Sequence, residues 1–473
     1  MTRFTIILMC FFGLTANGQD QVIKEIDQKS SFYGEIAQQI WEYAELGYLE
    51  EKSSSLLKST LEKEGFSITS GIAEIPTAFE ASFGSGSPVI GIMAEYDALP
   101  GVSQEAVPER KERTPGGNGH ACGHHLFGTA SVAAAISVKN WLESSGSSGT
   151  IKLFGTPAEE GGAGKVYMVR AGLFDDVDAM LHWHPGSRNA AWAASSLSNK
   201  SAKFRFYGQA SHAAAAPHNG RSALDAVEAM NFMANMMREH VPSETRIHYV
   251  ITSGGEAPNV VPAFAEVFYY VRHPEMQWVK DIFDRLVNVA EAAAMGTETK
   301  MEYEVIHGLY NLLPNETLSR VMHENLEKIG GVHYTEEEVA FAEAIKETLP
   351  KNAKTDINSA KSVIPFQVLE RGQGGSTDVG DVSWQVPTAG LSTATWVPGT
   401  SAHTWQAVAA GGTSIGTKGM INAAKVISLT AIDIFNNPEL CNQALEELNR
   451  RRGKDFIYEA LLGDREPPLD YRK

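Results

Sequence analysis

The chain has 473 residues, of which 43% are hydrophobic and 21% are charged. This is the composition of a globular protein, and the length predicts two or three domains that need no disulfide bonds to fold. The formal net charge of −17 argues against nucleic acid or an anionic membrane as the main partner. A small anionic substrate stays possible, because its binding depends on local charge.

The first eighteen residues have the features of a secretory signal peptide. A basic residue precedes an apolar run at 4–14, which is too short to span a bilayer, and the small residues Ala16 and Gly18 are placed for cleavage. An uncleaved membrane anchor is the alternative. We expect residues 1–18 to be removed, and the mature chain to be secreted or periplasmic without a remaining membrane segment.

Helical and strand patterns alternate in the first part of the mature chain. Such alternation predicts an α/β fold with a mostly parallel central sheet covered by helices, in which the chemistry collects at the carboxyl ends of the strands. The predicted helices are 33–46, 53–64, 124–143 and 164–172, and the predicted strands are 76–83, 88–94, 150–155 and 177–183.

The pattern changes at about residue 198. A β-α-β-β-α-β order follows, which is the ferredoxin-like α+β unit, and helices at 315–329 and 415–436 come after it. We therefore expect a catalytic domain made of residues 19–197 and 312–473, interrupted by an inserted lid at 198–311. The predicted elements of the lid are 200–208, 222–239, 245–252, 264–272, 275–295 and 298–306.

The densest group of potential metal ligands lies at the start of the helix predicted at 124–143. It consists of His120, Cys122, His124 and His125, within six positions of the chain. Imidazole and thiolate suit a borderline-soft divalent cation, and the glycines around Cys122 allow the backbone to turn so that both donors reach one ion. The alternative is a polar helix start with incidental histidines.

A pair of glutamates, Glu159 and Glu160, directly follows the strand predicted at 150–155. Hydrolysis at a metal site needs one carboxylate that binds the metal and another that takes a proton from water. Two adjacent glutamates at a strand end can divide these roles. Most such pairs are solvated surface, but the buried strand before this one and the two glycines after it favour a site.

Further histidines follow other strand patterns. His182 and His184 end the strand predicted at 177–183, and one of them is expected to face the functional edge of the sheet. His403 lies in a late loop rich in glycine and serine. A lone loop histidine is more often a surface residue than a ligand.

These motifs, GHACGHH, PAEEGG, DAMLHWHP and GTSAHTW, resemble those of the aminoacylase/carboxypeptidase superfamily of two-metal hydrolases. The chain looks most like its amidohydrolases of the aminobenzoyl-glutamate type, over nearly the whole mature length and with the motifs in the same order. The resemblance implies two divalent metal ions, Mn²⁺ or Zn²⁺. The implied metal ligands are Cys122, His124, Glu160, His184 and His403.

The same resemblance gives roles to residues around the metal ligands. It makes Glu159 the general base, and Asp97 is expected to orient a histidine ligand. Two departures leave roles open. Many relatives have an aspartate where this chain has Glu95, and close relatives often have one where it has His125.

The lid contributes three further candidates. The resemblance implies that Asn259 and Arg272 contact the substrate, and an arginine fork suits a free carboxylate. Otherwise Arg272 is an ordinary surface residue at a strand end. His212 is expected to donate to the developing oxyanion. Relatives dimerise through the lid, so we expect a homodimer in which His212 serves the partner subunit's site.

The sequence thus predicts a metal-dependent amidohydrolase that cleaves the amide bond of N-acyl or N-aroyl amino acids. A dipeptidase or carboxypeptidase of the same superfamily is one alternative, although its dipeptidases usually have His-x-Asp where this chain has Glu95-Tyr96-Asp97. A catalytically silent binding protein on the same fold is another, and the presence of Glu159 argues against it.

Overall fold

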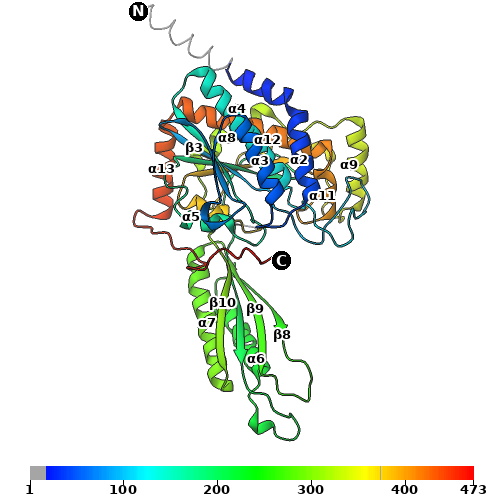
Figure 1. The fold of residues 1–473 in the computed structure, drawn as a ribbon, viewed down its shortest axis with the longest axis vertical. Helices are drawn as coiled ribbons and strands as arrows, with labels where there is room; N and C mark the ends of the chain where they lie inside the picture. Colours follow the sequence, from blue (N-terminus) through cyan, green and yellow to red (C-terminus); the bar gives the residue numbers. More distant parts are fainter. Residues whose placement is uncertain (1–17, 373) are drawn as a thin grey trace, which may run out of the picture.

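The computed structural model describes residues 18–372 and 374–473. The predicted signal peptide therefore lies outside the described residues, apart from Gly18. Figure 1 shows a larger body built around a central sheet and an elongated smaller body that extends from one side of it. Among the helices of the described residues, none is long and apolar enough to cross a membrane.

The larger body contains a six-stranded sheet with the order β1-β2-β4-β3-β5-β12. Strands β4, β3, β5 and β12 are parallel, while β1 and β2 form an antiparallel edge. The predicted, mostly parallel sheet is confirmed. The strands are β1 (Ser67–Ser70), β2 (Phe79–Ser85), β3 (Val89–Ala94), β4 (Gly149–Gly155), β5 (Ala179–Gly186) and β12 (Thr388–Ala394).

Helices cover both faces of this sheet, because its strands bury side chains on both sides. Ile92 of β3 packs in the main core with helices α2, α3, α4, α8 and α12, and its neighbour Met93 packs on the opposite face with α5 and α10. The helices of this body are α2 (Ser30–Tyr43), α3 (Glu51–Lys63), α4 (His124–Ser145), α5 (Gly164–Arg170), α8 (Glu316–Ile329), α9 (Glu336–Thr348), α10 (Val379–Ser383), α11 (Trp405–Gly411), α12 (Ser414–Asn436) and α13 (Glu439–Arg452).

The smaller body has its own sheet and its own core. Its four strands are antiparallel in the order β10-β7-β9-β8, and the helices α6 and α7 pack on one face of the sheet. The elements follow the chain in β-α-β-β-α-β order. They are β7 (Ser198–Tyr207), α6 (Ala223–Met237), β8 (Arg246–Ser253), β9 (Phe264–His273), α7 (Met276–Thr297) and β10 (Lys300–Leu309).

Short elements complete the described part of the chain. Strand β6, just before the chain enters the smaller body, pairs in parallel with β11, which follows that body in the chain. The short elements are β6 (Ala193–Ala194), β11 (Val368–Leu369) and the 3₁₀ turns η1 (Ile72–Glu74), η2 (Pro217–Asn219), η3 (Arg238–His240) and η4 (Ile357–Lys361).

A fully buried lysine joins the ends of several of these elements. Lys165, on α5, places Nζ 2.6 Å from Glu95 Oε1, directly after β3, and 2.7 Å from Asp378 Oδ1, directly before α10. Its backbone N–H also donates to Asp378 Oδ2 at 3.0 Å. Burial alone would lower the pKa of Lys165, but Asp378 and Glu95 raise it above its usual value. The lysine is therefore charged, and its single positive charge is shared by two buried carboxylates.

We predict that Lys165→Met lowers the free energy of unfolding by about 3–5 kcal/mol, because it leaves buried carboxylates without their counter-charge. Urea denaturation of the metal-free protein measures this effect. Lys29→Met is the control, because Lys29 forms a partly exposed ion pair with Glu64 at 3.2 Å, which is worth at most about 1 kcal/mol. Equal effects of the two substitutions would contradict the prediction.

Candidate metal centre

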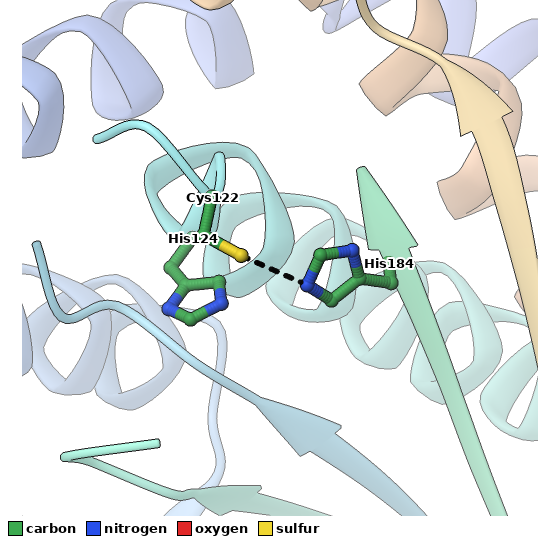
Figure 2. Close-up of side chains that lie close together, drawn as sticks. All are labelled: Cys122, His124 and His184. Carbon is green, nitrogen blue, oxygen red and sulfur yellow. Dashed lines mark hydrogen bonds between the residues drawn. The ribbon is translucent and has the colours of Figure 1, made fainter. Parts of the chain in front are cut away.

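The predicted site residues follow the carboxyl ends of the parallel strands. Asp97 comes shortly after β3, Glu159 and Glu160 follow β4, His184 lies near the end of β5, and His403 is in the loop after β12. Because parallel strands end at the same edge of a sheet, segments far apart in the sequence meet there. Helix α4 begins at this edge and brings Cys122 and His124 to it (Figure 2).

The first group of donors consists of Cys122, His124 and His184. One ligand atom from each lies within 4.8 Å of the others, and Cys122 Sγ is 3.3 Å from His184 Nε2 (Figure 2). His184 Nδ1 lies 2.8 Å from the carbonyl oxygen of Pro185. A carbonyl only accepts, so Nδ1 carries the proton and the lone pair of Nε2 faces the group.

The two oxygens of Asp97 contact His124 and the loop of Glu160. Asp97 Oδ1 lies 2.8 Å from His124 Nδ1, and its Oδ2 accepts the backbone N–H of Glu160 at 2.8 Å. The proton on Nδ1 leaves the lone pair of His124 Nε2 directed to the cluster. Although burial alone would raise it, His124 holds the pKa of Asp97 below its ordinary value.

The second group of donors consists of Cys122, Glu160 and His403, again within 4.8 Å of one another. His403 Nε2 is 3.0 Å from Glu160 Oε1. The His403 backbone is in the left-handed region, with φ of 62°, and its N–H donates to Ala121 O at 2.9 Å. This bond ties the late loop to the segment before Cys122, and Cys122 is common to both groups.

The donors fit two divalent cations. Thiolate, imidazole and carboxylate are the ligands of such ions. Three buried atoms of the cluster have no hydrogen-bond partner, namely Glu95 Oε2, His124 Nε2 and Glu160 Oε1. Glu95 Oε2 and His124 Nε2 lie only 3.1 Å apart. Burial alone would lower the pKa of His124, but Cys122, Asp97 and Glu95 raise it, and a bound cation would take the place of the Nε2 proton. Burial raises the pKa of the Cys122 thiol, and metal binding would favour the thiolate.

The two adjacent glutamates have different electrostatic environments. Burial raises the pKa of Glu159 well above its ordinary value, and the neighbouring Glu95 and Glu160 raise it further. Burial acts on Glu160 too, but the close approach of His403 Nε2 to its Oε1 holds its pKa below the ordinary value. A ligand oxygen of Glu159 lies within 4.8 Å of His124 and Glu95 donors. Glu159 is thus the carboxylate suited to exchange protons, and Glu160 the one suited to stay charged.

Other histidines and the second cysteine lie apart from the cluster. His120 and His125 place Nε2 3.0 Å from Ile40 O and 3.1 Å from Gly411 O, respectively. Burial lowers the pKa of both, so they are neutral donors with a structural role. His182 lines a different cavity. The described cysteines, Cys122 and Cys441, are both free. For Cys122, a free thiol is what a role as a metal ligand requires.

Several residues without a motif hold the loop of Glu159 and Glu160. Glu50 Oε1 accepts the backbone N–H of Ala158, which has φ of 59°, at 2.8 Å. His307, on β10, donates from Nε2 to Gly161 O at 2.6 Å and accepts the Tyr270 hydroxyl at Nδ1 at 2.7 Å. These contacts join residues far apart in the chain, so no local sequence signal indicated them.

A cavity of about 820 Å³ lies between the two bodies beside the cluster. Glu159, Glu160 and His403 line it from the larger body, and Arg272 lines it from the smaller one. The last residues of the chain complete the wall, as the red segment in Figure 1 shows between the two bodies. The structure therefore brings Arg272 to the predicted metal ligands.

His212 and Asn259 lie elsewhere. Both are exposed, and the backbone N–H of Ala213 donates to Asn259 O at 3.0 Å. The segment that contains His212 follows β7 at the far tip of the smaller body (Figure 1), and the ten residues of β7 span about 30 Å. Within one chain, the structure does not bring His212 or Asn259 to the cluster.

Comparisons with known proteins agree with this geometry. The chain is 44% identical to one of the subunits of p-aminobenzoyl-glutamate hydrolase of Escherichia coli, over 88% of this chain and 91% of that one. It is 30% identical to the human Xaa-Arg dipeptidase over 92% of this chain and 93% of that one. The fold resembles a dinuclear metal-binding peptidase of Bacillus subtilis, with a TM-score of 0.57 and 17% identity over 85% of this chain and 99% of that one.

A family model covers much of the central part of the chain. The model described as peptidase family M20/M25/M40 matches residues 91–406, a range that contains every predicted metal ligand. The metal-ligand donors and the paired glutamates within this range are suited to the hydrolysis of an amide bond. The chain belongs to peptidase family M20/M25/M40.

Proposed function

We propose that the protein is a metal-dependent amidohydrolase that cleaves the amide bond of N-acyl or N-aroyl amino acids. The arrangement that carries the proposal is the pair of donor groups sharing Cys122, with Glu159 beside them and Arg272 in the same cavity. In the proposal, Cys122, His124, Glu160, His184 and His403 bind two divalent ions, Mn²⁺ or Zn²⁺.

The residues divide the reaction between them. When bound, the two ions supply the Lewis acidity that activates water and polarises the amide carbonyl. Glu159 accepts a proton from the attacking water at its carboxylate and delivers it to the leaving nitrogen. Asp97 keeps the lone pair of His124 directed to the cluster, and Arg272 binds the free carboxylate of the amino acid.

The cavity has a positive charge that is free to bind a substrate carboxylate. In the described part of the chain, Arg272 forms no ion pair with a carboxylate, and its Nε is buried without a partner. An unpaired guanidinium favours a substrate with a free carboxylate, which an N-acyl amino acid and an Xaa-Arg dipeptide both have. The higher identity to the bacterial relative, 44% against 30%, favours a substrate like that named for it, and dipeptidase activity is the second candidate.

The surface of the smaller body supports a homodimer. Strand β8 is an edge of its sheet, and unpaired edges favour pairing with another chain. Apolar side chains are exposed on β8 and on α6, among them Val250 at 55%, Phe232 at 64% and Met236 at 58%. We propose that this face pairs with a second copy and that His212 completes the partner subunit's active site. We also propose that residues 198–311 form the inserted lid and that the protein is located outside the cytoplasm.

We predict that hydrolysis of p-aminobenzoyl-glutamate is lost after chelation and returns with Mn²⁺ or Zn²⁺, because water needs the bound ions for activation. Release of p-aminobenzoate from the demetallated and the reloaded protein measures this. A parallel screen with Xaa-Arg dipeptides tests the second candidate. Full turnover by a protein shown to be free of metal would exclude the proposed chemistry.

We predict that Glu159→Gln keeps its metal but loses turnover by about 10²- to 10⁴-fold, the usual contribution of a general base. Glu160→Gln is the matched control, because the same change at the neighbouring position removes a metal ligand. Metal content per subunit and the kcat of each variant measure the two effects. Loss of metal from Glu159→Gln, with retention in Glu160→Gln, would mean that the two roles are reversed.

We predict that activity returns when inactive Glu159→Gln subunits are mixed with inactive His212→Ala subunits under conditions that allow exchange. If His212 acts in trans, one site of each mixed dimer combines a normal Glu159 with a normal His212. Each variant alone, taken through the same exchange, is the control. Demonstrated exchange without recovery of activity would contradict the trans arrangement.

A further inference from the structure

We propose that Arg472, in the last segment of the chain, binds a second carboxylate of the substrate. The preferred substrates are then N-acyl or N-aroyl derivatives of a dicarboxylic amino acid. This inference rests on the proposed amidohydrolase function, and it adds to that function the residue that would recognise the second carboxylate of a substrate such as p-aminobenzoyl-glutamate.

The last residues of the chain are packed in place and form part of the cavity wall. The Tyr471 hydroxyl donates to the carbonyl oxygen of Glu160 at 3.1 Å, and its ring packs edge-on against Tyr48 with centroids 5.6 Å apart. Leu462 and Leu469 pack in the same apolar cluster. This packing fixes the chain up to Tyr471, so that the neighbouring Arg472 is held at the active-site loop.

Arg472 has donors that the protein leaves unused. Its Nη2 donates to the Glu160 carbonyl oxygen at 2.8 Å, while its Nε is buried without a hydrogen-bond partner. The guanidinium lies against the ring of Tyr471, 4.9 Å from the centroid. Among the described residues, Arg472 forms no ion pair with a carboxylate, and the residue is only partly exposed. A buried, unpaired N–H of an arginine is costly unless a ligand accepts from it.

Arg272 presents the same features on another wall of the cavity. Its Nε is also buried without a partner, and its guanidinium lies 5.3 Å from the centroid of the Tyr270 ring. Tyr270 and His307 lie near both arginines. Burial lowers the pKa of His307 to about 4, and the positive charges of Arg465, Arg472 and Arg272 contribute to the decrease. His307 is therefore neutral and adds no third charge.

The other charged residues of the cavity are paired or solvated. Arg465 donates to the carbonyl oxygens of Val305 and Ile306 and lies 3.6 Å from Glu304. Lys203 lies 3.9 Å from Glu266, and Asp470 is exposed to solvent. This leaves two guanidinium groups for ligands. An arginine fork matches a carboxylate, so the cavity is suited to a substrate with two carboxylates, one for each arginine.

A purely structural role of Arg472 would have a different consequence. Its bond to the Glu160 carbonyl could serve only to position the loop of Glu159 and Glu160. Loss of that bond would slow every substrate by the same factor. Loss of a carboxylate contact would slow only the substrates that carry the second carboxylate. The ratio of kcat/KM between two matched substrates, one with and one without the second carboxylate, therefore separates the two roles.

The experiment compares p-aminobenzoyl-glutamate with p-aminobenzoyl-glutamine, which keeps the first carboxylate and replaces the second by a neutral amide of the same size. The metal-loaded wild-type protein is expected to prefer the glutamate substrate by about 10- to 100-fold in kcat/KM, the range for a hydrogen bond to a charged group. Arg472→Gln is expected to abolish this ratio. Arg472→Lys, which keeps the charge without the fork, is expected to reduce the ratio less.

Lys473→Gln is the matched control, because it makes the same change of charge one residue later, on an exposed side chain, and is expected to keep the wild-type ratio. Arg272→Lys is expected to slow the hydrolysis of both substrates, since both carry the free α-carboxylate that Arg272 is proposed to bind. Equal slowing of both substrates by Arg472→Gln would overturn the inference, and so would a wild-type ratio near one. Either result leaves the proposed function intact, whereas no hydrolysis of either substrate by the metal-loaded wild type would reject that function itself.

Discussion

The spacing of the two donor groups depends on one buried carboxylate, that of Asp97. One of its oxygens fixes the ring of His124, in the group with Cys122 and His184, and the other fixes the backbone of Glu160, in the group with His403. Asp97 follows β3 in the middle of the parallel strands and is 1% exposed, so the sheet sets its position. The distance between the groups is therefore a property of the sheet edge, and loops at the surface can vary without changing it.

The same edge shows how neighbouring residues of one type acquire different chemistry. Glu159 and Glu160 have identical side chains, but Glu160 faces His403 while Glu159 faces other carboxylates. Burial penalises the charge of both, and only Glu160 has a partner that compensates for this. The contacts that fix this difference come from Glu50, His307 and Tyr471, which hold the backbone of the loop in one orientation.

Features that depend on local pattern could be predicted from the sequence, and features that depend on distant contacts could not. The apolar run of β3 and the alanine-rich helix α4 indicated a covered parallel sheet, and the density of donors near Cys122 indicated a metal site. Strand β1 was not predicted, because its four residues are largely exposed and carry no apolar alternation. The roles of His307 and Arg472 were not predicted either, because they arise where β10 and the chain end meet the loop of Glu160.

The position of Tyr471 and Arg472 also affects how the protein can be handled. Both contact the carbonyl oxygen of Glu160, so any peptide that follows Lys473 begins one residue from the cavity wall. An affinity tag or a fused reporter placed there would emerge beside the substrate, and a truncation before Tyr471 would remove part of the wall.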